Sequence, residues 1–380
     1  MSNDKKIQMV DLISQYQDIK EEVKAEFDRV LDSAMFINGP LVKEFQADLE
    51  QYLGVKHVIP CANGTDALQV AMMAYDFPKG SEVLVPSFTY VATVEVIALL
   101  GFRPVFVEVC PKSFNVDIKD LESKITDKSV AIVPVHLYGQ CADMERLMPV
   151  AEKHNLVVLE DTAQAIGADY TYSDGRTVKA GTIGHAGATS FFPSKNLGCY
   201  GDGGALMTND DELAGKMRMI VNHGQSKRYY HDSIGVNSRL DSLQAAVLKV
   251  KLKRLDTYNA ARQKVADRYD AAFAPTGKIT PPFRSPFSTH VFHQYTVKLS
   301  DEVDRDGLNA YLAERQIPSM IYYPVPNHLQ KAYTGYGYKE GDFPLTEDLC
   351  SRVISFPIHT EMDESQQDRI IDGVLSFLNK

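Results

Sequence analysis

Short apolar runs rich in valine and isoleucine recur in the first half of the chain, and helical stretches separate them. These runs lie at 82–86, 104–109, 131–135 and 156–160. Runs that are apolar on both faces are typical of parallel strands covered by helices on both sides. The pattern therefore predicts an α/β fold with a mostly parallel central sheet. In such folds, ligands bind beyond the carboxyl ends of the strands.

The length of the chain, 380 residues, exceeds the roughly 250–300 residues at which a single core stops growing. We expect two domains: a large α/β domain with an N-terminal helical segment, 1–257, and a smaller C-terminal α+β domain, 258–380. Helical periodicity dominates 210–273, and a proline-rich stretch at 275–286 follows it. The smaller domain is expected to contain a strand near 293–298, a helix near 304–316, a strand near 318–322 and a final helix near 364–379.

Composition excludes several other classes of protein. The formal net charge of -10 argues against a nucleic-acid partner, because phosphate backbones are held by clustered lysine and arginine. No segment approaches the roughly 18 apolar residues of a membrane span, and the N-terminus lacks the pattern of a signal peptide. The five cysteines are odd in number and lack Cys-x-x-Cys spacing, which favours neither disulfides nor a metal site. We expect a cytoplasmic protein with reduced thiols.

A lysine and an aspartate are predicted to lie beyond the ends of strands of this sheet, where ligands bind in such folds. Asp161 follows the run that ends at Glu160, and Lys195 lies between two closely spaced strands expected near 187–192 and 203–208. A lysine amine can hold an aldehyde as a Schiff base. An aspartate under a pyridine ring can keep its nitrogen protonated, so that the ring withdraws electrons. This layout is that of a pyridoxal phosphate enzyme.

A candidate phosphate site precedes the helical stretch 68–74. Backbone N–H groups at a helix start attract an anion, Gly64 permits close approach and Thr65 adds a hydroxyl. The alternative is a plain helix cap that uses Asn63 or Thr65.

Three further side chains are candidates for contacts with the cofactor. Gln164 could reach the phenolic oxygen of the cofactor, Tyr90 could stack on its ring, and Ser190 could add a second phosphate contact.

Taken together, these segments resemble the DegT/StrS family of sugar aminotransferases, which have the aspartate-aminotransferase fold. The resemblance runs from about Asp11 to Pro357, through the motifs at 36–40, 61–68, 138–140, 160–168, 190–204, 235–241 and 322–326. It implies a fold type I pyridoxal phosphate transferase in which Lys195 is the Schiff-base lysine and Asp161 pairs with the pyridinium nitrogen. It also implies that Gly64, Thr65 and Ser190 hold the phosphate.

The resemblance further implies a homodimer with shared active sites, in which Asn237 completes the phosphate site of the other subunit. The implied reaction is transamination, with L-glutamate as donor and a nucleotide-linked keto-sugar as acceptor. Within the family, the chain is most similar to enzymes that convert UDP-2-acetamido-2-deoxy-3-oxo-glucuronate to its 3-amino sugar in lipopolysaccharide and other surface polysaccharide synthesis. The sugar pocket would then be lined by Phe36, Ser194, Arg239, Tyr322 and Tyr323.

Other substrates and activities remain open. Arg239 can bind a carboxylate through two parallel hydrogen bonds. Both a uronate sugar and the donor glutamate carry carboxylates, so Arg239 does not identify the sugar. Tyr322 stands where the uronate enzymes carry histidine, and Phe36 where they carry tyrosine. A dTDP-3-keto-6-deoxyhexose 3-aminotransferase is therefore the nearest alternative, and a 4-keto-sugar aminotransferase is less favoured.

Two further classes are a regulator without turnover and an aldolase or decarboxylase on the same fold. The regulator would be expected to have lost the lysine or the aspartate. The lyase would have no need of the motifs at 235–241 and 322–326.

Overall fold

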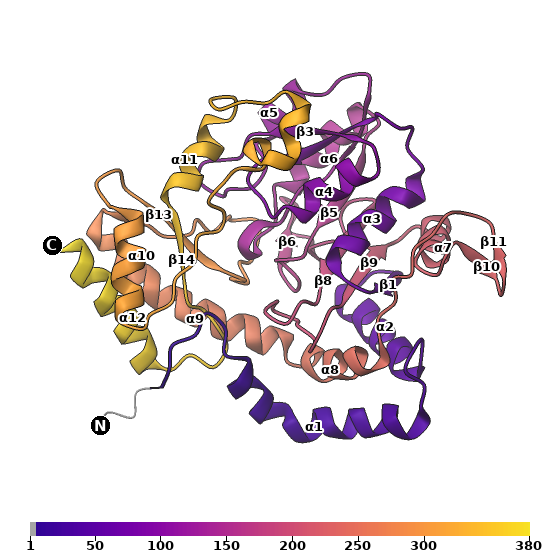
Figure 1. Ribbon diagram of the computed structural model, residues 1–380, viewed down its shortest axis with the longest axis horizontal. Coiled ribbons are helices and arrows are strands. Elements are labelled where there is room, and N and C mark those ends of the chain that lie inside the picture. The colour runs from indigo at the N-terminus through magenta and orange to yellow at the C-terminus, as the bar shows by residue number, and fades with distance from the viewer. Residues whose placement is uncertain (1–4) are drawn as a thin grey trace.

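A twisted seven-stranded sheet forms the centre of the molecule in the computed structural model, which describes residues 5–380 (Figure 1). Its strands, in spatial order, are β1 (His57–Cys61), β9 (Gly204–Thr208), β8 (Ala186–Ser190), β5 (Val157–Asp161), β4 (Ser129–Ile132), β2 (Glu82–Pro86) and β3 (Arg103–Val107). Only β9 runs antiparallel to its neighbours. The predicted mostly parallel sheet is confirmed.

Helices cover both faces of this sheet because successive strand residues point to opposite sides. The helices of this large unit are α1 (Leu12–Ser33), α2 (Pro40–Leu53), α3 (Gly64–Tyr75), α4 (Ala92–Leu99), α5 (Ile118–Ser123), α6 (Met144–Lys153), α7 (Asp211–Ile220) and α8 (Ser242–Leu252). Val83 and Val85 of β2 belong to the core cluster that includes residues of α3, α4 and α7, whereas Leu84 belongs to the cluster that includes residues of α5 and α6.

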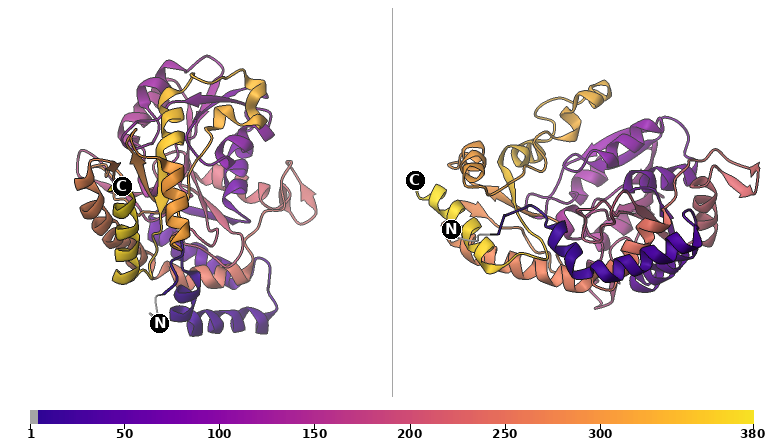
Figure 2. Two further views of the ribbon diagram at one scale, coloured as in Figure 1. Left: turned by 60° about the vertical axis from the view of Figure 1, so that its left-hand side comes forward. Right: turned by 60° about the horizontal axis from the view of Figure 1, so that its bottom comes forward.

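The C-terminal part builds a smaller α+β unit around its own core. A three-stranded antiparallel sheet has the order β12 (Ile279–Thr280), β13 (Tyr295–Leu299), β14 (Val353–Phe356). Its helices are α9 (Leu255–Phe273), α10 (Arg305–Glu314), α11 (Pro344–Arg352) and α12 (Glu364–Leu378). The start of the described chain joins this unit, since Ile7 packs in its core and the Gln366 side chain donates to the Lys6 carbonyl (Figure 2).

Helix α9 links the two units without a break. Leu255 packs with the core of the large unit, while Val265, Tyr269 and Phe273 pack in the small one. The partition 1–257 and 258–380 places its boundary inside this helix and stays a prediction.

Two local predictions were wrong. The helical pattern over 210–273 is interrupted at 222–241, where a hairpin of β10 (Gln225–Lys227) and β11 (Tyr230–His231) projects from the body (Figure 1). Gly224 has φ +67, and a Cβ there would lie 1.7 Å from the Ser233 carbonyl oxygen, so this turn requires glycine.

The strand expected at 318–322 is only an isolated bridge between Met320 and Ser355. Flanking prolines, which lack N–H donors, oppose a longer ladder. β13 pairs with β12 on one side and with β14 on the other, and sequence analysis did not predict β14.

Among residues 5–380, no helix is long and apolar enough to cross a membrane.

Candidate active site

A cavity of about 780 Å³ opens where the carboxyl ends of the parallel strands meet the small unit. Asp161 ends β5, Ser190 ends β8, and Lys195 lies in the loop between β8 and β9, as the sequence predicted. Most of the predicted site residues line this one cavity: Gly64, Thr65, Tyr90, Asp161, Gln164, Ser190, Ser194, Lys195, Tyr322 and Tyr323.

Lys195 is the only lysine among the residues that line this cavity. Loss of solvation lowers the pKa of its amine to about 8, although the charge of Asp161 acts in the opposite direction. The loop is fixed next to it, because the Asn196 amide donates to Asn259 Oδ1 at 2.7 Å and to the Val291 carbonyl at 2.9 Å. With a pKa of about 8, roughly a tenth of the amine is uncharged at pH 7 and able to attack a carbonyl carbon, far more than for an ordinary lysine.

Asp161 is buried at the end of β5 and held by two donors. Its Oδ2 accepts from the Thr93 hydroxyl at 2.7 Å, and its Oδ1 accepts from the Ala163 N–H at 3.1 Å. Sequence analysis missed Thr93. Its only signal is a hydroxyl within the apolar helix α4, which is a site where such a group needs a buried partner.

The start of α3 forms a concave anion site. Asn63 Oδ1 caps the N–H of Asp66 at 2.8 Å, and in the described structure the N–H groups of Gly64 and Thr65 have no protein acceptor. A Cβ on Gly64 would lie 2.6 Å from the Cβ of Ser190, so any larger residue would close the space between them. The arrangement combines the predicted helix cap with an open site for a phosphate.

Three tyrosines and a glutamine form one wall of the cavity, the tyrosine wall: Tyr90, Tyr322, Tyr323 and Gln164. The Gln164 amide donates to the Tyr323 hydroxyl at 3.0 Å, and its Oε1 accepts from the Tyr138 N–H at 2.8 Å. The Tyr90 and Tyr323 rings lie 6.2 Å apart between centroids, and the Tyr138 hydroxyl donates to the Tyr322 carbonyl. Sequence analysis missed the role of Tyr138, which lies in a motif that it quoted without assigning a contact.

His293 and Gln294 also line the cavity and were missed. His293 Nδ1 and Gln294 Oε1 are buried without a partner in the part of the chain that the structure describes. Burial, aided by the charge of Lys195, holds the pKa of His293 well below its usual range. The imidazole is therefore neutral and can exchange hydrogen bonds with a ligand.

Phe36, Asn237 and Arg239 lie outside this cavity. The Ser242 N–H donates to the Phe36 carbonyl at 2.8 Å, and Ile37 bridges Asp241. Asn237 is exposed and bridges Asn222. The structure of one chain thus separates these three residues from the others.

The residues of the cavity fit pyridoxal phosphate. The start of α3 offers N–H groups to a phosphate, while Asp161 and Lys195 supply an acid and an amine for a ring and an aldehyde. Unpaired polar atoms at Thr89 and His293 have room for partners from a ligand. No cluster of His, Cys, Asp or Glu suited to a metal ion occurs within 5–380.

The model of the DegT/DnrJ/EryC1/StrS aminotransferase family matches residues 17–375. The chain belongs to this family. It is therefore an aminotransferase whose cofactor is pyridoxal phosphate, and the sequence-based family resemblance is confirmed.

Curated relatives cover nearly the whole aminotransferase. A Geobacillus stearothermophilus relative named pleiotropic regulatory protein is 44% identical, over 98% of both chains. UDP-2-acetamido-2-deoxy-3-oxo-D-glucuronate aminotransferase of Pseudomonas aeruginosa is 43% identical, over 94% of this chain and 96% of its own. A dTDP-3-amino-3,4,6-trideoxy-alpha-D-glucose transaminase of Streptomyces venezuelae is 39% identical, over 99% of this chain and 97% of its own.

A solved structure has the same fold. NtdA from Bacillus subtilis, with bound cofactor PMP, superposes with a TM-score of 0.89 at 29% identity and covers 100% of this chain and 87% of its own. Together with the sheet order, this likeness confirms the predicted fold class.

Proposed function

We propose that the aminotransferase moves the amino group of L-glutamate to C3 of UDP-2-acetamido-2-deoxy-3-oxo-glucuronate, in lipopolysaccharide or other surface polysaccharide synthesis. The observation that carries the transamination is the cavity that Lys195 and Asp161 both line, together with Tyr323. The Pseudomonas aeruginosa relative supports the choice of sugar. The five cysteines are unpaired, which suits a reducing compartment such as the cytoplasm.

Asp161 would hold the proton on the ring nitrogen of the cofactor. When bound, pyridoxal phosphate withdraws electrons from the carbon that bears the amino group. The Thr93 hydroxyl and the Ala163 N–H each occupy one carboxylate oxygen and so fix the plane of the carboxylate. Gln164 and Tyr90 would contact the ring from the wall that they share with Tyr323.

Lys195 would move the proton between the donor carbon and the cofactor carbon. Its lowered pKa, about 8, leaves enough neutral amine at physiological pH to accept a proton, and the charged form can return it. One side chain thus serves as base and then as acid. Because donor and acceptor react in turn at the same cavity, ping-pong kinetics are expected.

The phosphate would bind the N–H groups of Gly64 and Thr65 and the Ser190 hydroxyl. We infer that Asn237 reaches the phosphate of a second subunit in a homodimer, because it is exposed and does not line the cavity of its own chain. Arg239 and Phe36 also lie outside that cavity and would enter the sugar pocket of the partner in the same way.

Mixing two inactive variants tests this shared site. Each active site would combine Lys195 of one subunit with Asn237 of the other, so a dimer of one Lys195→Ala chain and one Asn237→Asp chain contains one intact site. Random mixing makes half of the dimers mixed, and it should therefore restore about a quarter of the wild-type activity. An active cofactor-loaded monomer in sedimentation, or no activity after subunit exchange, would argue against the shared site.

A dTDP-3-keto-6-deoxyhexose is the second candidate acceptor, because the Streptomyces venezuelae relative takes its name from a dTDP-amino-sugar. Arg239 would then serve the carboxylate of glutamate alone. Tyr322, in place of the histidine of uronate enzymes, is the residue in this cavity that favours this alternative.

Separate incubations with each keto-sugar distinguish the two candidate acceptors. Cofactor-loaded protein is incubated with L-glutamate and either the UDP-3-keto-uronate or the dTDP-3-keto-6-deoxyhexose, and 2-oxoglutarate and amino-sugar are followed by mass spectrometry. We expect turnover of the UDP-uronate. Turnover of only the dTDP sugar would show that the second candidate is the acceptor. If neither sugar led to release of 2-oxoglutarate, both candidate acceptors would be wrong.

A further inference from the structure

Two segments that are distant in sequence are joined beside the tyrosine wall of the cavity. The Asn327 N–H donates to the Ser87 carbonyl at 3.0 Å, and the Asn327 side chain donates to the Thr89 carbonyl at 2.9 Å. The Phe88 ring lies 6.1 Å from the Tyr323 ring, between centroids. The segment that carries Tyr90 is therefore tied to the segment that follows Tyr323.

A buried histidine connects the same two segments to helix α11. His328 Nδ1 lies 2.7 Å from the Ser87 hydroxyl, and its Nε2 lies 3.1 Å from Glu347 Oε1. A carboxylate can only accept, so Nε2 donates to Glu347 and Nδ1 accepts from Ser87. Burial lowers the pKa of His328, which favours this neutral form. Both Ser87 and His328 are buried, so the serine is not placed to attack a substrate.

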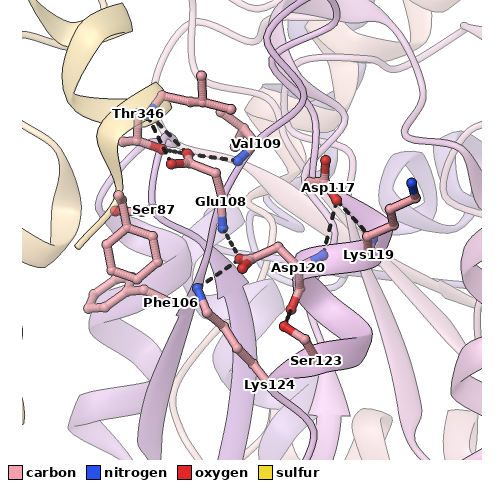
Figure 3. Close-up of polar contacts among 12 residues, drawn as sticks. Ser87, Phe106, Glu108, Val109, Asp117, Lys119, Asp120, Ser123, Lys124 and Thr346 are labelled. Carbon is pink, nitrogen blue, oxygen red and sulfur yellow. Dashed lines mark hydrogen bonds and ion pairs between the residues drawn. The ribbon is translucent and has the colours of Figure 1, made fainter. Parts of the chain in front are cut away.

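Glu347 is itself held by the large unit through the start of α11. Figure 3 shows the Glu108 carboxylate facing Thr346, whose N–H donates to it at 2.9 Å and whose hydroxyl donates at 2.5 Å. The Glu108 N–H in turn donates to Asp120 at 2.6 Å. Glu347 also accepts from the Gly341 N–H at 2.9 Å. Glu347, which accepts from His328, is thus held by the contact of Thr346 with Glu108 and by its own contact with the Gly341 N–H.

We propose that His328 is a positioning residue: it fixes the turn after Tyr322 and Tyr323 against Ser87–Tyr90, and so sets the wall that meets the acceptor sugar. This inference rests on the proposed function, which names a keto-sugar as the acceptor. Lys195, Asp161 and the phosphate site lie on other elements. Tyr90 would contact the cofactor ring in both half-reactions, but only the keto-sugar would also meet Tyr322 and Tyr323. Loss of His328 should therefore impair the acceptor half-reaction more than the donor half-reaction.

The test uses the holoenzyme and measures the two half-reactions separately, with L-glutamate and with the keto-sugar. His328→Phe keeps a ring beside Phe343 but removes both hydrogen bonds. We expect kcat/KM for the keto-sugar to fall about tenfold, while that for glutamate changes less than about twofold. His328→Gln should recover most of the loss, because its amide can accept from Ser87 and donate to Glu347.

Hydrogen exchange of the peptide amides supplies a readout that needs no substrate. Faster exchange in both 87–90 and 322–328 is expected for His328→Phe and, to a smaller extent, for Ser87→Ala, which carries the test if the first variant does not fold. His359→Phe is the matched control, because His359 is equally buried, accepts from the Glu361 N–H at 3.2 Å and does not line the cavity.

Selective loss in the acceptor half-reaction with faster exchange in the two segments supports the positioning role. Equal loss in both half-reactions, no loss, or exchange unchanged in these segments overturns it. If the wild-type enzyme turns over neither keto-sugar, the proposed acceptor fails, and the exchange data still decide whether His328 joins the two segments.

Discussion

Lys195 and Lys251 show that burial and reactivity are different properties of a lysine. Loss of solvation lowers the pKa of each amine to about 8. Lys195 faces a cavity of about 780 Å³ that also contains Asp161. Lys251, on α8, packs against the Tyr200 ring with its amine 4.7 Å from the centroid. The lowered pKa alone would not distinguish them, and the cavity and the carboxylate are what support the proposed role of Lys195.

The largest effect should follow from Lys195→Ala, which removes the proposed base. We expect transamination to fall at least about a thousandfold, since no other lysine lines the cavity. The measurement is release of 2-oxoglutarate from glutamate. Lys251→Met is the matched control and should retain at least about half of the activity. If the Lys195→Ala variant kept the wild-type rate, the proposed role of this lysine would be wrong.

Asp161→Asn tests whether the charge of Asp161 distinguishes Lys195 from Lys251, because it keeps the shape of the carboxylate and removes its charge. We expect a loss of about a hundredfold to a thousandfold in kcat, as for removal of one preorganised electrostatic partner. Thr93→Val deletes only the 2.7 Å hydrogen bond to Asp161 and should cost about tenfold. Steady-state rates of both variants with saturating cofactor provide the test, and an equal loss in the two would show that orientation matters more than charge.

Lys251→Met should stabilise the protein at pH 7. The variant removes a buried charge, and this gain exceeds the lost contact with Tyr200, so we expect the free energy of unfolding to rise by about 1–2 kcal/mol. Urea denaturation of wild type and variant measures the difference. A lower stability of the variant would mean that the contact with the tyrosine ring outweighs the cost of burying the amine.

The smallest effect is a pH dependence of that difference. The pKa of Lys251 is about 8 in the folded chain against an ordinary 10.5, so the unfolded chain binds more protons between these values. Wild-type stability gains from this group as pH rises through that window, and the gain is absent below pH 8. The advantage of Lys251→Met should therefore shrink between pH 8 and 9.5 in parallel denaturation series. A constant advantage would show that Lys251 does not titrate there.

Sequence analysis predicted where Asp161 and Lys195 lie in the fold because each residue has a local signal. The apolar runs placed Asp161 at a strand end and Lys195 between β8 and β9, and both placements agree with the structure. It did not find Thr93, His293 or His328, because their contacts come from residues far away along the chain. It also extended a helix across 222–241, where backbone geometry at Gly224 imposes a turn.

The sequence by itself determined the class of fold, the family and the chemical types of the central residues, because hydrophobic periodicity and short motifs are local properties. Only the tertiary structure decided which of these residues share a cavity and which lie outside it, as Asn237 and Arg239 do. It alone showed that Lys195 lines a cavity that Asp161 also lines, whereas Lys251 is buried against the Tyr200 ring. The reason is physical: desolvation, hydrogen-bond partners and access to a cavity depend on packing between distant segments, which no stretch of sequence contains.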